Sequence, residues 1–200
     1  MRRIAAAIAA LGAAALGTAS VPALAYQVDP LTRMPVVTYA PGAQPSYEPR
    51  AEITAPPREI VPYSGRHAPG TIVVSTEERR LYFVLPGGQA VRYAVGVGRP
   101  GFTWGGNMSI TRKAEWPSWT PPAQMLKRRP DLPRFMAGGP DNPLGARALY
   151  LGSSLYRIHG SNEPETIGQA VSSGCIRMMN EDVMDLYERA RVGTRVVVLR

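Results

Sequence analysis

The sequence holds one cysteine, Cys175, and its neighbours are the residue types that a reactive thiol needs. A cysteine attacks as the thiolate, so it requires a base or a positive charge close by. Gly174 lets the backbone approach a substrate closely, and Arg177 can bind a carboxylate through two parallel hydrogen bonds. His159, which ends an apolar run and precedes Gly160, is the one histidine after residue 70 and therefore the candidate base. The pattern indicates a Cys–His nucleophilic pair.

A plainer interpretation of these residues stays open from composition alone. A single cysteine is most often a small buried apolar side chain, and a single histidine is most often structural. The Gly-Cys-Ile-Arg setting and an export signal favour the catalytic pair, because a free thiol in an oxidising compartment is exposed to damage. One cysteine excludes an internal disulfide framework and a cysteine-rich zinc site.

The first 25 residues have the three parts of a secretory signal peptide. Two arginines follow the initiating methionine, residues 4–16 form an apolar run, and residues 23–25 read Ala-Leu-Ala, the small-x-small pattern of a cleavage site. We expect cleavage after Ala25. An uncleaved membrane anchor is the alternative, but Pro22 and the Ala-x-Ala site favour cleavage.

The charge balance fits an exported protein with anionic surroundings. The chain has 23 Lys and Arg, two of them in the signal peptide, against 15 Asp and Glu, so the mature chain has a net charge of +6. Such an excess attracts anionic polymers and surfaces, and it also favours solubility. No segment resembles a nucleic-acid-binding module, and export argues against one, so we expect no nucleic-acid partner.

Residues 26–69 are typical of an extended spacer. Prolines recur at positions 30, 35, 41, 45, 49, 56, 57, 62 and 69, and the short apolar pieces between them follow neither a helical nor an alternating period. We expect this polyproline-prone segment to lie outside the folded domain, with His67 as a solvated side chain.

Residues 70–200 are expected to form one mainly β (α+β) domain. Runs of β-branched and aromatic residues are separated by polar or Pro-Gly turns. Residues 89–97 have a period of two, with Val91, Tyr93, Val95 and Val97 on one face. The first three strands should form an antiparallel meander. The expected strands are 71–75, 80–85, 89–97, 108–113, 146–151, 155–158 and 194–199, and a short helix is expected at 121–129.

One clear helix is expected near the C-terminus. Asn180 is a suitable N-cap, and the acidic residues at 181 and 182 match the positive end of the helix dipole. Gly193 should end the helix. Its apolar face is formed by Val183, Leu186, Tyr187 and Ala190. In residues 98–145, Trp104, Trp116 and Trp119 suit a lid or cleft wall, although such aromatic side chains also cap cores.

The run Ser172-Ser173-Gly174-Cys175-Ile176-Arg177, preceded by His159-Gly160, resembles the signature of the L,D-transpeptidase catalytic domain family, also called YkuD or ErfK/YbiS-like. Segments 70–73, 142–146, 156–160 and 193–196 extend the likeness over residues 70–199. The resemblance implies a β-sandwich-like fold of mixed sheets that presents the cysteine and the histidine in one cleft. It also implies a periplasmic, wall-associated enzyme with no metal and no cofactor, and we expect a monomer.

The resemblance implies a reaction with a role for each residue. Cys175 would attack the carbonyl after the L-centre of diaminopimelate in a peptidoglycan stem tetrapeptide, releasing D-Ala and forming a thioester. An amine of a second stem would then take the acyl group, giving a 3→3 cross-link. His159 would transfer protons, the Gly160 carbonyl would orient it, and backbone amides near Gly174 and Cys175 would hold the oxyanion. The side chains implied to contact substrate are Arg177, Ser173 and Tyr156.

One departure from the family pattern concerns Ser173, because many members have a histidine at that position. This difference leaves open which donor and acceptor stem peptides the enzyme would prefer. Other reactions of the same residues stay open: an L,D-carboxypeptidase or endopeptidase, or attachment of an outer-membrane protein to the wall. A non-catalytic wall-binding module would be expected to have lost the cysteine or the histidine. A papain-like protease is disfavoured, because the histidine here precedes the cysteine.

Overall fold

The computed structural model describes residues 27–28, 35–36 and 55–200. The predicted signal peptide lies outside the described residues, as does most of the predicted spacer. In the N-terminal part, β1 (Gln27–Val28) pairs antiparallel with β2 (Pro35–Val36). The second compact unit, Pro49–Arg200, contains the whole domain discussed below.

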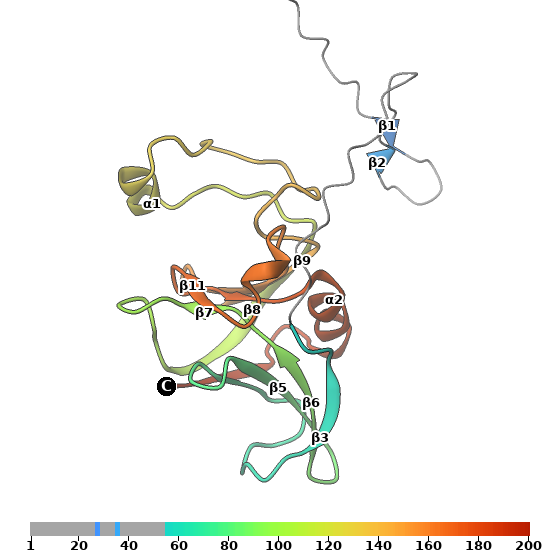
Figure 1. Cartoon of the computed structure of the whole chain (residues 1–200). Helices are drawn as coiled ribbons and strands as arrows, with labels where there is room; N and C mark the ends of the chain where they lie inside the picture. Colours follow the sequence, from blue (N-terminus) through green and yellow to red (C-terminus); the bar gives the residue numbers. More distant parts are fainter. Residues whose placement is uncertain (1–26, 29–34, 37–54) are drawn as a thin grey trace, which may run out of the picture. The chain divides into compact units, whose positions relative to one another are not determined.

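Most of this domain is one curled, mixed sheet of nine strands (Figure 1). Its strand order is β12-β10-β9-β8-β13-β4-β5-β6-β3. The predicted meander is confirmed, since β4, β5 and β6 pair antiparallel in sequence order, whereas β13 pairs with β4 and β10 with β12 in parallel. The strands are β3 (Glu59–Pro62), β4 (Ile72–Ser75), β5 (Arg80–Leu85), β6 (Gln89–Ala94), β8 (Gly106–Glu115), β9 (Arg147–Leu151), β10 (Arg157–His159), β12 (Ile176–Arg177) and β13 (Arg195–Leu199).

The strand predicted over residues 89–97 ends after Ala94 in the structure. The residues that follow it pair with a strand from a distant part of the sequence. Gly96 and Arg177 exchange two backbone hydrogen bonds of 2.9 Å, which join the chain after β6 to β12. A Cβ atom on Gly96 would lie 2.9 Å from the Thr166 carbonyl oxygen, so glycine permits this approach. Immediately afterwards β7 (Val97–Gly98) pairs in parallel with β11 (Ala170–Ser172), forming a second, two-stranded sheet.

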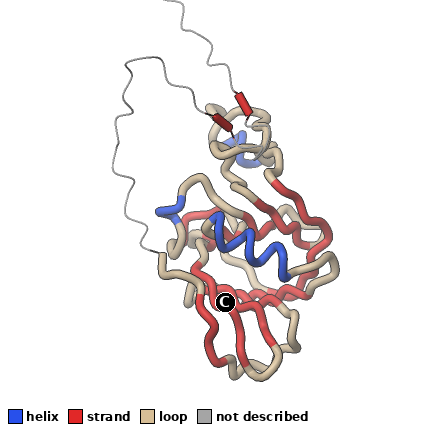
Figure 2. The backbone as a smooth tube through the Cα atoms, turned by 90° about the vertical axis from the view of Figure 1, so that its right-hand side faces the viewer, coloured by secondary structure: helices blue, strands red, loops and turns tan. Residues whose placement is uncertain are grey.

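The main core lies between the concave face of the sheet and the C-terminal helix. Apolar side chains from alternate strand positions fill it, as the period of two requires. Figure 2 shows α2 (Asn180–Arg189) lying across strands, and it packs on β9 and β10. The largest fully buried side chains include Tyr93, Ile72, Leu81, Ile110, Leu149, Leu151, Ile158, Ile176, Met178 and Leu186.

The start of α2 differs by one residue from the expectation. Met179, not Asn180, is the N-cap, and no side chain caps the helix N-terminus. Asn180 is the first helical residue, and its amide bonds instead to the backbone of Ala146 and Ser161. A tertiary contact therefore replaces the local cap that the sequence favoured.

The last part of the predicted spacer is packed on the domain, which corrects the expectation for residues 59–62. These residues form β3, an antiparallel edge strand on β6, and Arg58 pairs with Asp182 of α2 at 3.1 Å. Ile60 is 62% exposed, so backbone hydrogen bonds rather than apolar burial hold the strand. Residues 59–62 have no hydrophobic periodicity, so the sequence pattern did not predict this strand. His67 is half-buried, and its Nδ1 lies 2.7 Å from the Tyr63 hydroxyl.

The remaining helical segments are short. The helix predicted at 121–129 is present as α1 (Ala123–Arg128), with Pro122 at its N-cap, and η1 (Pro164–Thr166) is a single 3₁₀ turn. Within the described residues, none of the helices has the length and the apolar run that a membrane crossing requires.

Candidate active site

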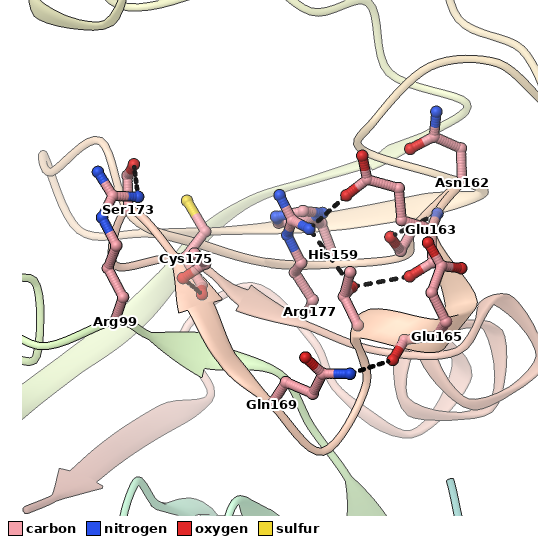
Figure 3. A network of polar contacts seen from close by, with 12 residues as sticks. Arg99, His159, Asn162, Glu163, Glu165, Gln169, Ser173, Cys175 and Arg177 are labelled. Carbon is pink, nitrogen blue, oxygen red and sulfur yellow. Dashed lines mark hydrogen bonds and ion pairs between the residues drawn. The ribbon is translucent and has the colours of Figure 1, made fainter. Parts of the chain in front are cut away.

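A parallel strand pair brings the predicted nucleophile and base together. In the register of β10 and β12, Ile158 lies opposite Ile176 and His159 opposite Arg177. Both isoleucines are buried in the core, so the neighbouring positions face the other side of the sheet. Cys175 immediately precedes β12 and shares this side with His159 and Arg177 (Figure 3). Cys175 and His159, which are 16 positions apart in the sequence, thus lie on one face of the sheet.

This face lines a cleft of about 480 Å³. Its lining is largely apolar, with a smaller number of polar and titratable side chains, which is the usual composition of a ligand site. Trp119 is part of the wall, whereas Trp116 is not. The lining residues are Phe102, Trp119, Pro122, Gln124, Met125, Pro143, Leu144, Leu155, Tyr156, Arg157, His159, Ser172, Ser173, Cys175 and Arg177.

His159 is held in one orientation and one tautomer. Its ring is buried, and Nδ1 lies 2.6 Å from the Gly160 carbonyl oxygen. A carbonyl only accepts, so Nδ1 carries the hydrogen and Nε2 keeps a free lone pair. Burial, followed by the positive charge of Arg177, lowers the pKa of His159 to about 3. The imidazole is therefore neutral at neutral pH, with Nε2 unprotonated.

The backbone around Gly160 is fixed by Asn180, a residue whose role the sequence analysis missed. The Asn180 Oδ1 accepts the N–H of Ala146 at 2.9 Å and that of Ser161 at 3.3 Å, while Nδ2 donates to the Ser161 carbonyl at 3.1 Å. A Cβ atom on Gly160 would lie 2.2 Å from this Oδ1. Only distant sequence positions converge here, so no local pattern could have indicated the contact.

The segment before the cysteine is organised by Ser172. Its hydroxyl donates to the Cys175 carbonyl at 2.6 Å and accepts the Gly174 N–H at 3.1 Å. The Gly174 amide, expected to hold an oxyanion, is thus already bonded within the chain. Among the described residues none accepts a hydrogen bond from the Cys175 N–H. Of the two amides, the one of Cys175 is therefore the one left without a partner among the described residues.

Gly174 is required where it stands. Its φ of +109° lies in the region that favours glycine, and a Cβ atom there would lie 2.6 Å from the Tyr156 ring. Tyr156 stacks on Trp104 with ring centroids 4.5 Å apart, and the Trp104 indole donates to the Gly174 carbonyl at 2.7 Å. Tyr156 lines the cleft as expected, and it also supports the turn that presents Cys175.

Cys175 is half-buried, and its thiol points into the cleft with Sγ 3.8 Å from the Leu155 carbonyl oxygen. Arg177 lies in the same cleft, but its Nη1 is already paired with the Glu163 carboxylate at 2.7 Å. Ser173 lies beside the cysteine and accepts a hydrogen bond of 3.3 Å from Arg99. In the described part of the chain, no three His, Cys, Asp or Glu side chains gather as metal ligands would.

Comparisons with known proteins identify the family of this chain. Residues 69–198 match the family model described as "YkuD: L,D-transpeptidase catalytic domain". The chain is 39% identical over 156 residues to "Probable L,D-transpeptidase ErfK/SrfK" of Escherichia coli, covering 74% of this chain and 49% of that protein. It is 41% identical over 134 residues to "Probable L,D-transpeptidase YbiS" of the same organism, covering 62% and 43%.

The fold has also been seen in solved structures. The crystal structure of L,D-transpeptidase 3 from Mycobacterium tuberculosis superposes with a TM-score of 0.54 at 17% identity, covering 65% of this chain and 60% of that one. At that identity the likeness concerns the fold. This chain spans about half the length of the curated relatives it matches. The family match covers most of the chain, and the protein belongs to the L,D-transpeptidase catalytic domain family.

Proposed function

We propose that this protein is an exported peptidoglycan L,D-transpeptidase that works through a Cys175 thioester. The observation that supports this most is the arrangement of Cys175 and His159 on one face of the β10–β12 pair, inside one cleft. The histidine is neutral, and its Nδ1 is engaged, so Nε2 is the nitrogen left to act as the base.

In the first half of the reaction, His159 Nε2 takes the thiol proton as Sγ attacks the carbonyl that joins the L-centre of diaminopimelate to D-Ala. A tetrahedral oxyanion forms, and the Cys175 N–H is the free backbone donor beside it. The C–N bond then breaks. The imidazolium returns its proton to the departing amine of D-Ala, and the tripeptide remains as a thioester on Cys175.

The second half repeats these steps with an amine as nucleophile. His159 accepts a proton from the attacking amine, the thioester collapses, and the thiol leaves with a proton. An amine of a second stem gives a 3→3 cross-link, and a lysine amine of an outer-membrane protein gives attachment of that protein to the wall. The signal peptide predicted in residues 1–25 supports a periplasmic location, where both acceptors are available.

The test is to incubate the mature chain, residues 26–200, with defined tetrapeptide muropeptides and to identify the products by mass. A cross-linked dimer with loss of D-Ala is expected. Release of D-Ala with a tripeptide and no dimer would instead assign the alternative L,D-carboxypeptidase activity. Unchanged substrate, or equal turnover by Cys175→Ala, would contradict the proposal.

A further inference from the structure

Among the described residues, Arg177 on one side of Cys175 is ion-paired with a carboxylate, whereas Arg99 on the other side is not. Arg157, which also lines the cleft, donates from Nη1 to the Leu155 carbonyl. On one side of Cys175, Arg177 forms its ion pair with Glu163 at 2.7 Å and donates to the Thr166 hydroxyl at 3.3 Å. On the other side, Arg99 points toward Ser173 (Figure 3). Arg177, the residue that the motif suggested for a substrate carboxylate, already holds a carboxylate of the protein.

Arg99 lies beside the cleft and contacts residues that line it. Its backbone N–H donates to the Ser172 carbonyl at 3.0 Å, and its Nη1 donates to the Ser173 hydroxyl at 3.3 Å. The guanidinium carbon lies 4.2 Å from the centroid of the Phe102 ring, and both Phe102 and Ser173 line the cleft. Among residues 55–200, no acidic side chain lies within ion-pair distance of Arg99.

A second guanidinium shares the same ring. Arg128, the last residue of α1, lies 5.4 Å from the Phe102 centroid, and it too lacks an acidic partner among residues 55–200. The ring attracts both guanidinium groups, so it holds two positive charges close to the Ser173 side of the cleft. A substrate carboxylate bound beside this ring would accept charge-assisted hydrogen bonds from a guanidinium group that no carboxylate of residues 55–200 engages.

We propose that Arg99 and Arg128 form a carboxylate subsite on the Ser173 side of the cleft, and that it takes a carboxylate of the stem peptide. The inference deepens the proposed function and rests on it. A donor stem tetrapeptide offers three carboxylates of this chemistry: those of D-Glu, of the D-centre of diaminopimelate, and of the terminal D-Ala. Because Ser173 is two residues from the nucleophile, a carboxylate held there fixes which carbonyl reaches Cys175.

The experiment compares four tetrapeptides, one with all carboxylates free and three with one carboxylate amidated, using kcat/KM for D-Ala release. For the wild type, amidation of one particular carboxylate should lower kcat/KM by about 10-fold to 100-fold, the usual effect of losing a charge-assisted hydrogen bond. Arg99→Gln should lower kcat/KM for the free peptide by a similar factor and should leave the value for that amidated peptide unchanged. The identity of the sensitive peptide shows which carboxylate is bound.

Two further variants make the result interpretable. Arg128→Gln changes an exposed side chain and should reproduce part of the loss without affecting folding, which covers the case in which Arg99→Gln is unstable. Arg191→Gln, an exposed arginine after α2, is the charge-matched control and should behave as the wild type.

Equal discrimination by wild type, Arg99→Gln and Arg128→Gln would overturn the subsite. So would a result in which Arg157→Gln or Arg177→Gln alone abolished the preference for the free carboxylate. These outcomes are distinct from failure of the proposed function, in which the wild type would release no D-Ala from any of the four peptides.

Discussion

Gly160 and the side chain of Asn180 pack so closely that a Cβ atom on residue 160 would lie 2.2 Å from the Asn180 Oδ1. The Gly160 carbonyl is also the group that holds His159 Nδ1, at 2.6 Å. The orientation of His159 therefore depends on the contact between Gly160, which follows β10, and Asn180, the first residue of α2.

Gly160→Ala should accordingly displace the carbonyl that orients His159. Overpacking of this kind costs about 1–3 kcal/mol, so we expect a lower free energy of unfolding together with slower acylation of Cys175. Both are measured directly, by urea unfolding and by the rate of thioester formation. The matched control is Gly139→Ala, because a Cβ atom there meets nothing within 4 Å. Wild-type acylation in Gly160→Ala would show that the carbonyl position does not matter.

The buried histidine should make folding sensitive to acid. Because the folded-state pKa of His159 is about 3, against an ordinary value of 6.5, the unfolded chain binds a proton between these pH values that the folded chain does not. Stability from this group is complete above pH 6.5 and falls as the pH is lowered, by at most about 1.4 kcal/mol per pH unit.

Urea unfolding at pH 8, 7, 6, 5 and 4 measures this effect, with His159→Gln as the comparison. The variant should lose stability less steeply than the wild type below pH 6.5, and the two curves should run parallel above it. Parallel curves over the whole range would mean that the protein does not keep this imidazole neutral.

Proton transfer should depend on His159 and not on Ser173. Loss of a positioned general base costs about 10²–10⁴-fold in rate, so His159→Gln should slow acylation by that order. Ser173 accepts a hydrogen bond from Arg99, and a hydroxyl takes no proton at neutral pH without a base of its own. Ser173→Ala should lose far less. Acylation rates of both variants over a range of pH decide the matter, and equal losses would make Ser173 part of the catalytic set.

The domain should need the residues that the sequence assigned to the end of a spacer. A chain beginning at Ala55 keeps β3 and the Arg58–Asp182 ion pair, whereas a chain beginning at Arg66 loses both. Loss of Arg58 leaves the buried Asp182 without its partner, so the shorter chain should have a lower melting temperature. Calorimetry of the two chains tests this, and equal melting temperatures would restore a boundary near residue 70.

The sequence predicted those parts of the fold and site whose information is local. The meander, the C-terminal helix and the mainly β class follow from periodicity, and the family resemblance was carried by a short run around Cys175. Contacts between positions that are distant in the sequence could not be predicted from local patterns. The edge strand β3 has an exposed Ile60 and no apolar period, and the bonds of Asn180 to Ala146 depend on tertiary structure. The ion pair between Arg177 and Glu163 is of the same kind.

The central claim is that Cys175 is the nucleophile, and covalent trapping by a carbapenem-type β-lactam tests it most directly. The strained ring contains an acyl carbonyl, and once a thiolate opens it, the leaving amine stays attached, so the drug remains on the protein as a thioester. Intact-mass measurement should show one drug-sized adduct on the wild type, because the chain has one cysteine, and no adduct on Cys175→Ala. An unmodified wild-type mass after long exposure, or an equal adduct on Cys175→Ala, would contradict the account.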